Sequence, residues 1–210
     1  MPSPILTVDE LTVSFRTRKG TAEAVRGLSY ELHPGETLAI VGESGSGKSV
    51  SALALMGLLP KTAQVSGSAT FEGTDLFTMK KEQRRSLRGG RMAMIFQDPM
   101  TAFNPVHTIG DQLAEAIRIH RHEVSKKDAY TEVEDLLRQV GVPEPGRRVH
   151  QYPHEFSGGM RQRAMIAMAI ANNPAVLIAD EPTTALDVTI QAQVMEALAE
   201  AQESTGSAMI

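Results

Sequence analysis

The sequence predicts an α/β fold, because its apolar residues alternate between short continuous runs and stripes at helical spacing. The clearest runs are Thr37–Val41 (TLAIV) and Ala175–Ala179 (AVLIA), which are typical of buried strands. A Gly-rich loop and a helical stripe follow the first run, as in an α/β unit. The 210 residues, 41% hydrophobic and 22% charged, have the composition of a globular protein.

Most of the other strands are expected in the first half of the chain. Ile5–Phe15 and Ala24–Leu32 are interpreted as two strands joined by a polar loop. Further strands are expected around Val65–Phe71 and Arg91–Phe96. Between these pairs a helix follows the Gly-rich loop, and Pro60 is expected to end it. The apolar stripe of that helix consists of Ala52, Leu55, Met56 and Leu59.

The pattern becomes helical between residues 107 and 171. Ser125 is predicted as the N-cap of a helix that stops at Gly141, and Ser157 as the N-cap of another. We interpret the block from about 107 to 157 as a helical insertion within a single domain that spans 1–210. A last helix carries an apolar face made of Ile190, Val194, Ala197, Leu198 and Ala201.

Composition argues against several functions. With 21 Lys+Arg and 25 Asp+Glu the formal charge is −4, which disfavours generic binding to nucleic acid or anionic membranes. The absence of cysteine excludes disulfides, thiolate metal sites and cysteine nucleophiles in this chain. No apolar stretch approaches the ~18 residues of a membrane span, and the start lacks the pattern of a signal peptide. We expect a soluble, intracellular domain.

Two features that suggest other chemistry have simpler interpretations. The basic run from Lys80 to Arg91 has no aromatic residues between its charges for stacking on bases, so a solvated helix face is favoured over a nucleic-acid surface. His120 and His122 are two residues apart, which places them on different faces of a helix. Surface histidines are therefore favoured over a metal site.

The sharpest functional signal is a loop that matches the pattern G-x-x-x-x-G-K-[ST]. It consists of Gly42, Glu43, Ser44, Gly45, Ser46, Gly47, Lys48 and Ser49. Its glycines let successive N–H groups face phosphate oxygens, and the following helix adds the positive end of its dipole. Lys48 supplies a charge for the β and γ phosphates, and the Ser49 hydroxyl is a ligand for Mg²⁺. The loop predicts binding of ATP with Mg²⁺.

Two adjacent carboxylates, Asp180 and Glu181, follow the apolar run AVLIA. Alone they could mark an ordinary transition from strand to loop. Beside a phosphate-binding loop, Asp180 is predicted to bind Mg²⁺, usually through water, and Glu181 to orient or deprotonate the attacking water.

A third signal is the triplet Ser157, Gly158 and Gly159 at the start of a helix. Ser157 caps the helix while the glycines leave N-terminal amides open, which makes a second anion site. Read alone, such a triplet is most often only a cap.

Together these elements resemble the ATP-binding-cassette (ABC) ATPases. The phosphate loop, Gln97 in MIFQDP, the Ser157–Gly159 signature and Asp180–Glu181, with TALD behind them, stand in the order of that family. The resemblance implies a P-loop NTPase core with an N-terminal antiparallel β region. It also implies a helical subdomain inserted between the Gln97 loop and the signature.

The resemblance implies roles for further residues. Two such domains pair head to tail, so that ATP lies between the phosphate loop of one and the signature of the other. Gln97 becomes a ligand of Mg²⁺ or water that senses the membrane partner, and Asp187 a contact between subunits. Phe15 lies where the family places an aromatic ring against adenine; an ordinary strand aromatic is the alternative.

Longer stretches are similar to the oligopeptide, dipeptide and nickel importers. These are FQDPMTAFNP, YPHEFSGGMRQRAMIAMAIANNP and ADEPTTALDVTIQAQ. Within that branch, Met160 resembles the D-type ATP-binding subunit. The implied partners are a distinct F-type ATPase, two transmembrane permeases and, indirectly, an extracytoplasmic solute-binding protein, with no nucleic acid. The implied location is peripheral, at the cytoplasmic face of the cell membrane.

Alternatives remain open. The same importer type could carry nickel or another small solute, and a soluble cassette acting on nucleic acid or a regulatory module without turnover are less favoured. A histidine that contacts the γ-phosphate would lie a few residues after Ile210, so we expect the chain to be a fragment that binds nucleotide but hydrolyses it poorly.

Overall fold

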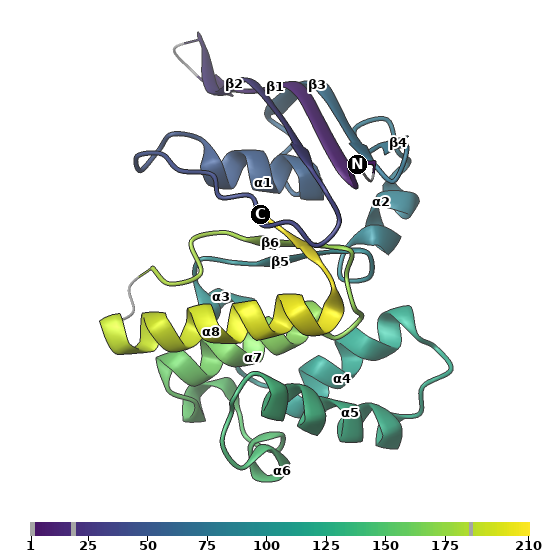
Figure 1. Cartoon of the computed structure of the whole chain (residues 1–210), viewed down its shortest axis with the longest axis vertical. Helices are drawn as coiled ribbons and strands as arrows, with labels where there is room; N and C mark the ends of the chain where they lie inside the picture. Colours follow the sequence, from purple (N-terminus) through teal and green to yellow (C-terminus); the bar gives the residue numbers. More distant parts are fainter. Residues whose placement is uncertain (1–2, 18–19, 185–186) are drawn as a thin grey trace. The chain divides into compact units, whose positions relative to one another are not determined.

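The structure is a computed structural model that describes residues 3–17, 20–184 and 187–210. The chain divides into two compact units (Figure 1). The first comprises residues 1–88 with 208–210, and the second residues 89–207. Each unit has its own set of buried apolar side chains.

The first unit is built on an antiparallel sheet. Its strands are β1 (Leu6–Thr17), β2 (Gly20–Leu32), β3 (Ala63–Phe71) and β4 (Thr74–Asp75), in the order β2-β1-β3-β4. Leu6, Val8, Leu11 and Val13 of β1 are buried, and the pairing with β2 shifts register between Val8 and Leu11. The antiparallel N-terminal region predicted from the sequence is therefore confirmed.

Helix α1 (Lys48–Met56) follows the Gly-rich loop and ends earlier than predicted. Gly57 adopts a left-handed conformation (φ 62°), and its N–H donates to the Ala54 carbonyl at 3.0 Å. The turn is a glycine C-cap, so Leu59 lies outside the helix. The helix stops at this glycine, before Pro60 is reached.

The basic run forms helix α2 (Lys81–Leu87), none of whose residues is buried, so the predicted solvated helix face is confirmed. Arg84 and Arg88 nevertheless donate hydrogen bonds to main-chain carbonyls of their own unit. The Arg84 guanidinium donates to the Phe77 carbonyl at 3.2 Å, and the Arg88 guanidinium donates to the Met56 carbonyl at 3.3 Å. The second contact places a positive charge at the C-terminal, negative end of α1.

Thr37–Val41, predicted as a buried strand, is not one. Only Thr37 forms a parallel bridge, with Met209 of β7 (Ala208–Met209), and Leu38 N–H donates to the Met209 carbonyl at 2.8 Å. Among the described residues of the first unit the run has no partner strand beyond this point, and Val41 is 93% exposed. An apolar run forms a strand only where neighbours satisfy its peptide groups.

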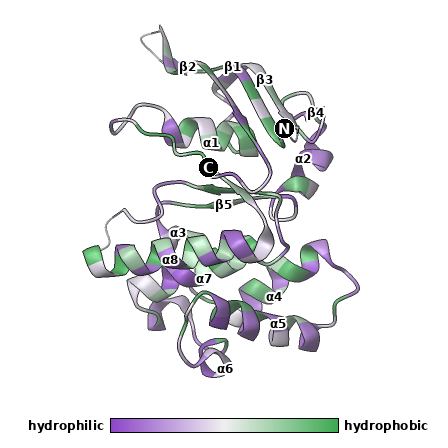
Figure 2. Cartoon of the chain, viewed as in Figure 1, coloured by the Kyte–Doolittle hydropathy of each residue, from purple (hydrophilic) through white to green (hydrophobic). Residues whose placement is uncertain are grey.

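The second unit contains a short parallel strand pair surrounded by helices. The strands are β5 (Met92–Ile95) and β6 (Val176–Ala179), and β5 is hydrophobic along its length (Figure 2). The helices are α3 (Pro99–Ala102), α4 (Ile109–His120), α5 (Lys126–Gln139), α6 (Pro145–Arg148), the 3₁₀ helix η1 (Pro153–Glu155), α7 (Gly158–Ile170) and α8 (Val188–Thr205).

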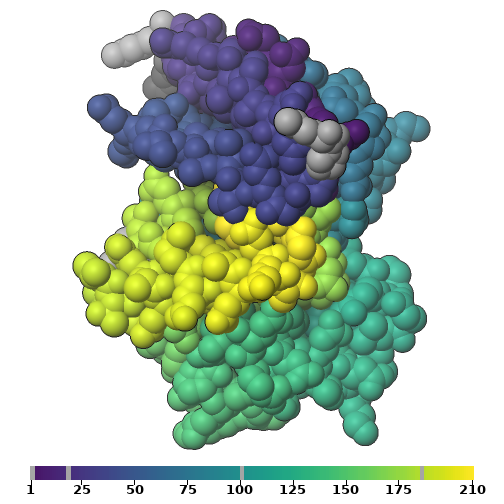
Figure 3. Space-filling view, viewed as in Figure 1, coloured from purple at the N-terminus to yellow at the C-terminus, as the bar shows by residue number. Residues whose placement is uncertain are grey.

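Helix α7 lies at the centre of the second unit. It packs against β5 and against helices α3, α4, α5 and α8, and most of its residues are buried. Helix α8 lies at the surface, where Val188 is 81% exposed (Figure 3).

The predicted caps of α5 are confirmed, because the Ser125 hydroxyl accepts from the Asp128 N–H and Gly141 follows the helix at φ 71°. Within the described residues no helix has the length and apolarity to span a membrane.

Candidate functional site

The loop Gly42–Ser49 leads directly into α1 in the first unit. Ser46 N–H donates to the Glu43 carbonyl at 3.1 Å, which closes a turn inside the loop. Gly47 is the N-cap residue of α1 at φ 95°, a conformation that glycine adopts readily, and no side chain caps the helix. The N-cap residue therefore brings no side chain to this helix N-terminus, where the helix dipole favours an anion.

Two of the loop glycines lie close to other atoms, Gly47 to main chain and Gly42 to a side chain. A Cβ on Gly47 would lie 2.2 Å from the Ala24 carbonyl oxygen of β2, and one on Gly42 would lie 2.6 Å from the Ser46 hydroxyl. Gly45, at φ 82°, has nothing within 4 Å of a Cβ. The loop is a main-chain cradle that rests on β2 at Gly47 and is open at Gly45.

The ammonium group of Lys48 lies inside this cradle. It donates to the Gly42 carbonyl at 2.8 Å and to the Glu43 carbonyl at 3.1 Å. Ser49 follows in the first turn of α1. The lysine charge is thus held on the first two residues of the loop, where phosphate oxygens can replace the two carbonyls.

Phe15 lies on β1 of the same unit and is half-buried. It pairs with Ala22 of β2 and with Ala63 of β3. Ala22 is two residues from Ala24, the point at which Gly47 approaches β2. Phe15 of β1 and Gly47 of the phosphate loop therefore both lie next to β2.

In the second unit, β5 and β6 bring the remaining acidic and amide groups together. Ile95 pairs with Ala179 in parallel register, and the Asp180 N–H donates to the Ile95 carbonyl at 3.0 Å. Gln97 stands two residues after Ile95, and Glu181 two residues after Ala179. Because parallel strands end at the same edge, the Gln97 amide reaches the Glu181 carboxylate and donates to Oε2 at 3.0 Å.

Glu181 has an unusual backbone and a second hydrogen-bond donor. Its φ is 46°, in the left-handed region that costs a non-glycine residue about 1–3 kcal/mol. The Thr184 hydroxyl donates to Glu181 Oε2 at 3.0 Å, and the Thr184 N–H donates to the Glu181 carbonyl at 3.1 Å. Sequence reasoning placed Thr184 in the TALD segment but gave it no role; its spacing of three residues from Glu181, typical of a turn, is the signal that points to the contact.

The signature triplet lies at the start of α7. The Ser157 hydroxyl accepts from the Met160 N–H at 3.3 Å, so the predicted N-cap is confirmed. A Cβ on Gly158 would meet nothing within 4 Å, whereas one on Gly159 would lie 3.0 Å from Ile190 of α8. Gly158 therefore faces open space, and Gly159 allows α7 and α8 to pack closely.

Asp187 caps α8, because its carboxylate accepts from the Ile190 N–H at 3.0 Å. Ala185 and Leu186 of the TALD segment lie outside the described residues. The same unit holds Gln97, Asp180, Glu181, Ser157–Gly159 and Asp187, and the other holds Phe15 and Gly42–Ser49.

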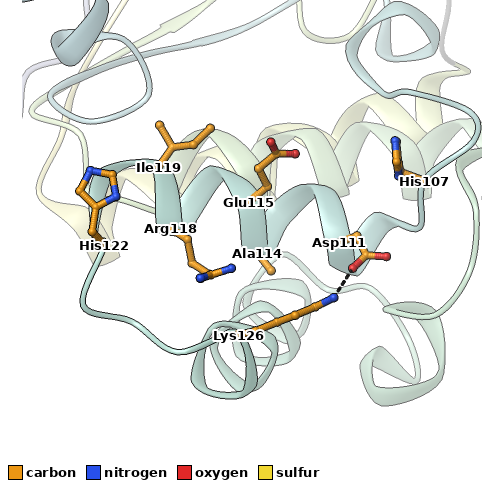
Figure 4. A pocket seen from close by; sticks show the side chains of 8 residues that line it. All are labelled: His107, Asp111, Ala114, Glu115, Arg118, Ile119, His122 and Lys126. Atoms are coloured by element: carbon orange, nitrogen blue, oxygen red, sulfur yellow. Dashed lines mark ion pairs between the residues drawn. The ribbon is translucent and has the colours of Figure 1, made fainter.

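A separate hollow of about 570 Å³ lies along α4 (Figure 4). Its lining residues are His107, Asp111, Ala114, Glu115, Arg118, Ile119, His122 and Lys126. Tyr130 donates to the Asp111 carboxylate at 2.7 Å, and Lys126 pairs with it at 3.2 Å. The bonds from Tyr130 and Thr108, with Lys126, lower the pKa of Asp111, whereas burial and the bond to Asp111 raise the pKa of Tyr130.

The family is decided by a match that covers most of the chain. The model of the family described as ABC transporter matches residues 25–184. The chain belongs to the ABC transporter family. The ABC resemblance predicted from the motifs is therefore confirmed.

Peptide-transport proteins are among the relatives of this ABC chain. It is 55% identical over 208 residues to the dipeptide transport ATP-binding protein DppD of Bacillus subtilis, covering 98% of this chain and 62% of the relative. It is 50% identical over 206 residues to the oligopeptide transport ATP-binding protein OppD of Escherichia coli, covering 98% and 61%. The chain thus spans less than two thirds of the length of these relatives.

Solved ABC cassettes share the fold. A dimeric post-hydrolysis structure of the ATP-binding cassette MJ0796, bound to ADP and Pi, matches with a TM-score of 0.85 at 24% identity, covering 97% of this chain and 85% of that one. The cbiO1 structure from Clostridium perfringens, part of the ABC transporter complex cbiONQ, matches with a TM-score of 0.77 at 26% identity, covering 99% and 77%. The predicted P-loop NTPase core is confirmed as the fold.

Proposed function

We propose that this chain is the ATP-binding and ATP-hydrolysing part of an ABC importer for di- and oligopeptides. The observation that carries the ATPase proposal is the main-chain cradle of Gly42–Ser49, which leads into an uncapped helix and holds the Lys48 ammonium on two loop carbonyls. The names of the DppD and OppD relatives support the peptide part.

The phosphate groups of ATP fit this cradle because its main chain is exposed at glycines, one of which, Gly47, admits no Cβ. A Cβ on Gly47 would lie 2.2 Å from the Ala24 carbonyl oxygen, so at this point the peptide groups of the loop form the binding surface. We assign Lys48 to the β and γ phosphates and Phe15 to the adenine ring. The half-buried ring of Phe15, on a strand that pairs with β2, supports the second assignment.

Ser49, Gln97 and Asp180 offer the oxygen ligands that Mg²⁺ prefers, so they would hold the ion that accompanies ATP. When bound, Mg²⁺ neutralises charge on the β and γ phosphates. The Gln97 amide nitrogen is engaged with Glu181, which leaves the amide oxygen as the ligand atom. The Asp180 backbone is anchored on β5, so its carboxylate starts from a fixed point.

Glu181 is the residue to which we assign catalysis. Its carboxylate orients the attacking water in line with the γ-phosphate and accepts a proton from it. The Lys48 charge stabilises the negative charge that develops on the phosphoryl oxygens. A second ATPase subunit contributes its signature to this ATP, as Ser157, Gly158 and Gly159 of this chain do to the sister site, while Asp187 lies at the subunit contact.

The helical block from about 107 to 157 and the Gln97–Pro105 loop connect the site to the permeases in this proposal. The partners are a distinct F-type ATPase, two permease subunits and, indirectly, an extracytoplasmic binding protein. The chain would lie at the cytoplasmic face of the membrane. We also propose that residues 1–210 form a single ATPase domain.

ATPase activity of the assembled transporter tests the proposal. The full-length protein is reconstituted in lipid with its permeases and sister ATPase, and hydrolysis is measured with the binding protein empty or loaded with a short peptide. We expect stimulation by the peptide and, in Glu181→Gln, a loss of at least about 100-fold with ATP binding retained. Activity that ignores peptide but responds to nickel would reject the peptide assignment. Activity unchanged in Glu181→Gln would reject the catalytic assignment.

A further inference from the structure

We propose that Thr184 is a positioning residue for ATP hydrolysis: its hydroxyl holds the carboxylate of Glu181 in the orientation that the reaction needs. The inference rests on the proposed function and adds one residue to the same site. Thr184 touches neither ATP nor water in this proposal; it acts through Glu181.

The geometry of the turn supports this role. Thr184 donates twice to Glu181, from its hydroxyl to Oε2 at 3.0 Å and from its N–H to the main-chain carbonyl at 3.1 Å. The backbone bond holds the two residues close together, so the Thr184 hydroxyl lies within hydrogen-bonding distance of the Glu181 carboxylate. A β-branched side chain has few rotamers, which lowers the entropy cost of holding this bond.

Glu181 needs such a partner because its own side chain is long. Three side-chain torsions separate its carboxylate from a backbone at φ 46°, and each free torsion would spread the carboxylate over several positions. A general base loses much of its effect when it is displaced by about 1 Å. A hydrogen bond to an ionised acceptor is strong enough to select one position.

A second donor to Glu181 Oε2, the Gln97 amide, follows the neighbouring parallel strand β5. Gln97 follows β5 and Thr184 follows β6, and both donate to Oε2 at 3.0 Å. Gln97 belongs to the loop that we assign to communication with the permease, so its contact is expected to change during transport. Of these two donors, Thr184 is the one that moves with Glu181 itself, because both belong to one turn.

The test compares threonine variants in the reconstituted full-length transporter. Thr184→Val keeps the branched shape and removes the hydroxyl, and Thr184→Ser keeps the hydroxyl. We expect kcat to fall about ten-fold or more in Thr184→Val, with KM and the Kd for ATP unchanged, because one charge-assisted hydrogen bond is lost. Thr184→Ser should retain kcat within about three-fold. A purely structural role would lower both variants or alter ATP binding.

Controls separate this inference from the proposed function. Thr78→Val removes an exposed hydroxyl that bonds the Asp75 carbonyl in the other unit, and it should leave kcat unchanged. Normal kcat in Thr184→Val, together with an inactive Glu181→Gln, would overturn the inference and leave the function standing. Equal losses in the valine and serine variants would also overturn it. If Thr184→Val does not fold, Thr184→Ala supplies the same comparison with serine.

Discussion

The two helix N-termini that we assign to nucleotide contacts, one to the ATP of this chain and one to that of its sister, are built in different ways. Helix α1 is entered through Gly47 at φ 95°, and this N-cap residue has no side chain to cap the helix. Helix α7 is entered through Ser157 in an extended conformation, and the Ser157 hydroxyl accepts from the Met160 N–H. One helix therefore begins at a glycine N-cap, and the other at a serine cap that two glycines follow.

The difference shows which parts of each terminus remain for a ligand. A side-chain cap satisfies one of the first N–H groups of a helix, whereas a glycine N-cap brings no side chain that competes with an anion for them. The α1 terminus is consequently suited to several phosphate oxygens. The α7 terminus offers a hydroxyl and an open surface at Gly158, which suits contact with a phosphate already bound to another chain.

The difference between the two helix N-termini predicts its largest effect on ATP binding and stability at Gly47. In Gly47→Ala the Cβ would lie 2.2 Å from the Ala24 carbonyl oxygen and φ would remain at 95°, so the loop must leave β2. We expect loss of ATP binding by at least about 100-fold and a lower Tm, measured by nucleotide titration and thermal unfolding. Gly45→Ala is the matched control: with nothing within 4 Å it carries only backbone strain of about 1–2 kcal/mol. Equal behaviour of the two variants would contradict the contact with β2.

A smaller effect is expected at the signature. Gly158→Ala meets nothing within 4 Å in this chain, so Tm and ATP binding by the isolated full-length subunit should be unchanged. Hydrolysis by the assembled transporter should fall at least about ten-fold, because the added methyl group enters the surface that faces the sister ATP. Gly159→Ala, 3.0 Å from Ile190, should lower Tm as well. A drop in Tm for Gly158→Ala would show that Gly158 is buried rather than open.

The smallest effect concerns a third terminus, that of α4, whose cap contains a titratable group. Thr108 accepts from the Asp111 N–H, and Tyr130, Thr108 and Lys126 lower the pKa of Asp111 in the folded state. A lowered carboxyl pKa stabilises the fold above the unfolded value near 3.9, and this contribution disappears as pH falls through the folded value. Asp111→Asn should therefore lower Tm between pH 5 and 7 by at most about 4 °C.

Thermal unfolding of both forms at several pH values checks this expectation. The Tm difference between them should shrink as pH falls below about 4, because protonation makes the carboxyl neutral in both states. Tyr130→Phe is the control, since it removes the first cause of the shift and should reduce the difference. A difference that grows in acid would contradict the sign.

The sequence predicted the features that depend on local patterns. The caps at Ser125 and Ser157 follow from side chains that reach only three residues, and β5 and β6 follow from continuous apolar runs. Thr37–Val41 has the same kind of run but pairs only at Thr37, because strand formation depends on neighbours that a local pattern does not contain. The end of α1 at Gly57 was missed because a breaking proline stood nearby.

In the candidate site, too, the features set by local sequence were predicted and those set by long-range contacts were not. Residue types predicted Lys48, Asp180 and Glu181, because phosphate and Mg²⁺ chemistry needs those groups at that spacing. The contact between Gln97 and Glu181 follows from the register of β5 against β6, which is a long-range property. The bond from Thr184 depends on the left-handed conformation of Glu181, and no propensity scale assigns that conformation to glutamate.

At Glu181, the left-handed backbone lowers the stability of the fold, while the side chain is the one that we assign to catalysis. Glycine would adopt φ 46° with little strain, so Glu181→Gly would relieve much of a cost of about 1–3 kcal/mol, offset by the greater freedom of glycine in the unfolded chain. The same change removes the carboxylate that Gln97 and Thr184 hold. A search for thermostable variants would thus favour a substitution here that yields an inactive protein.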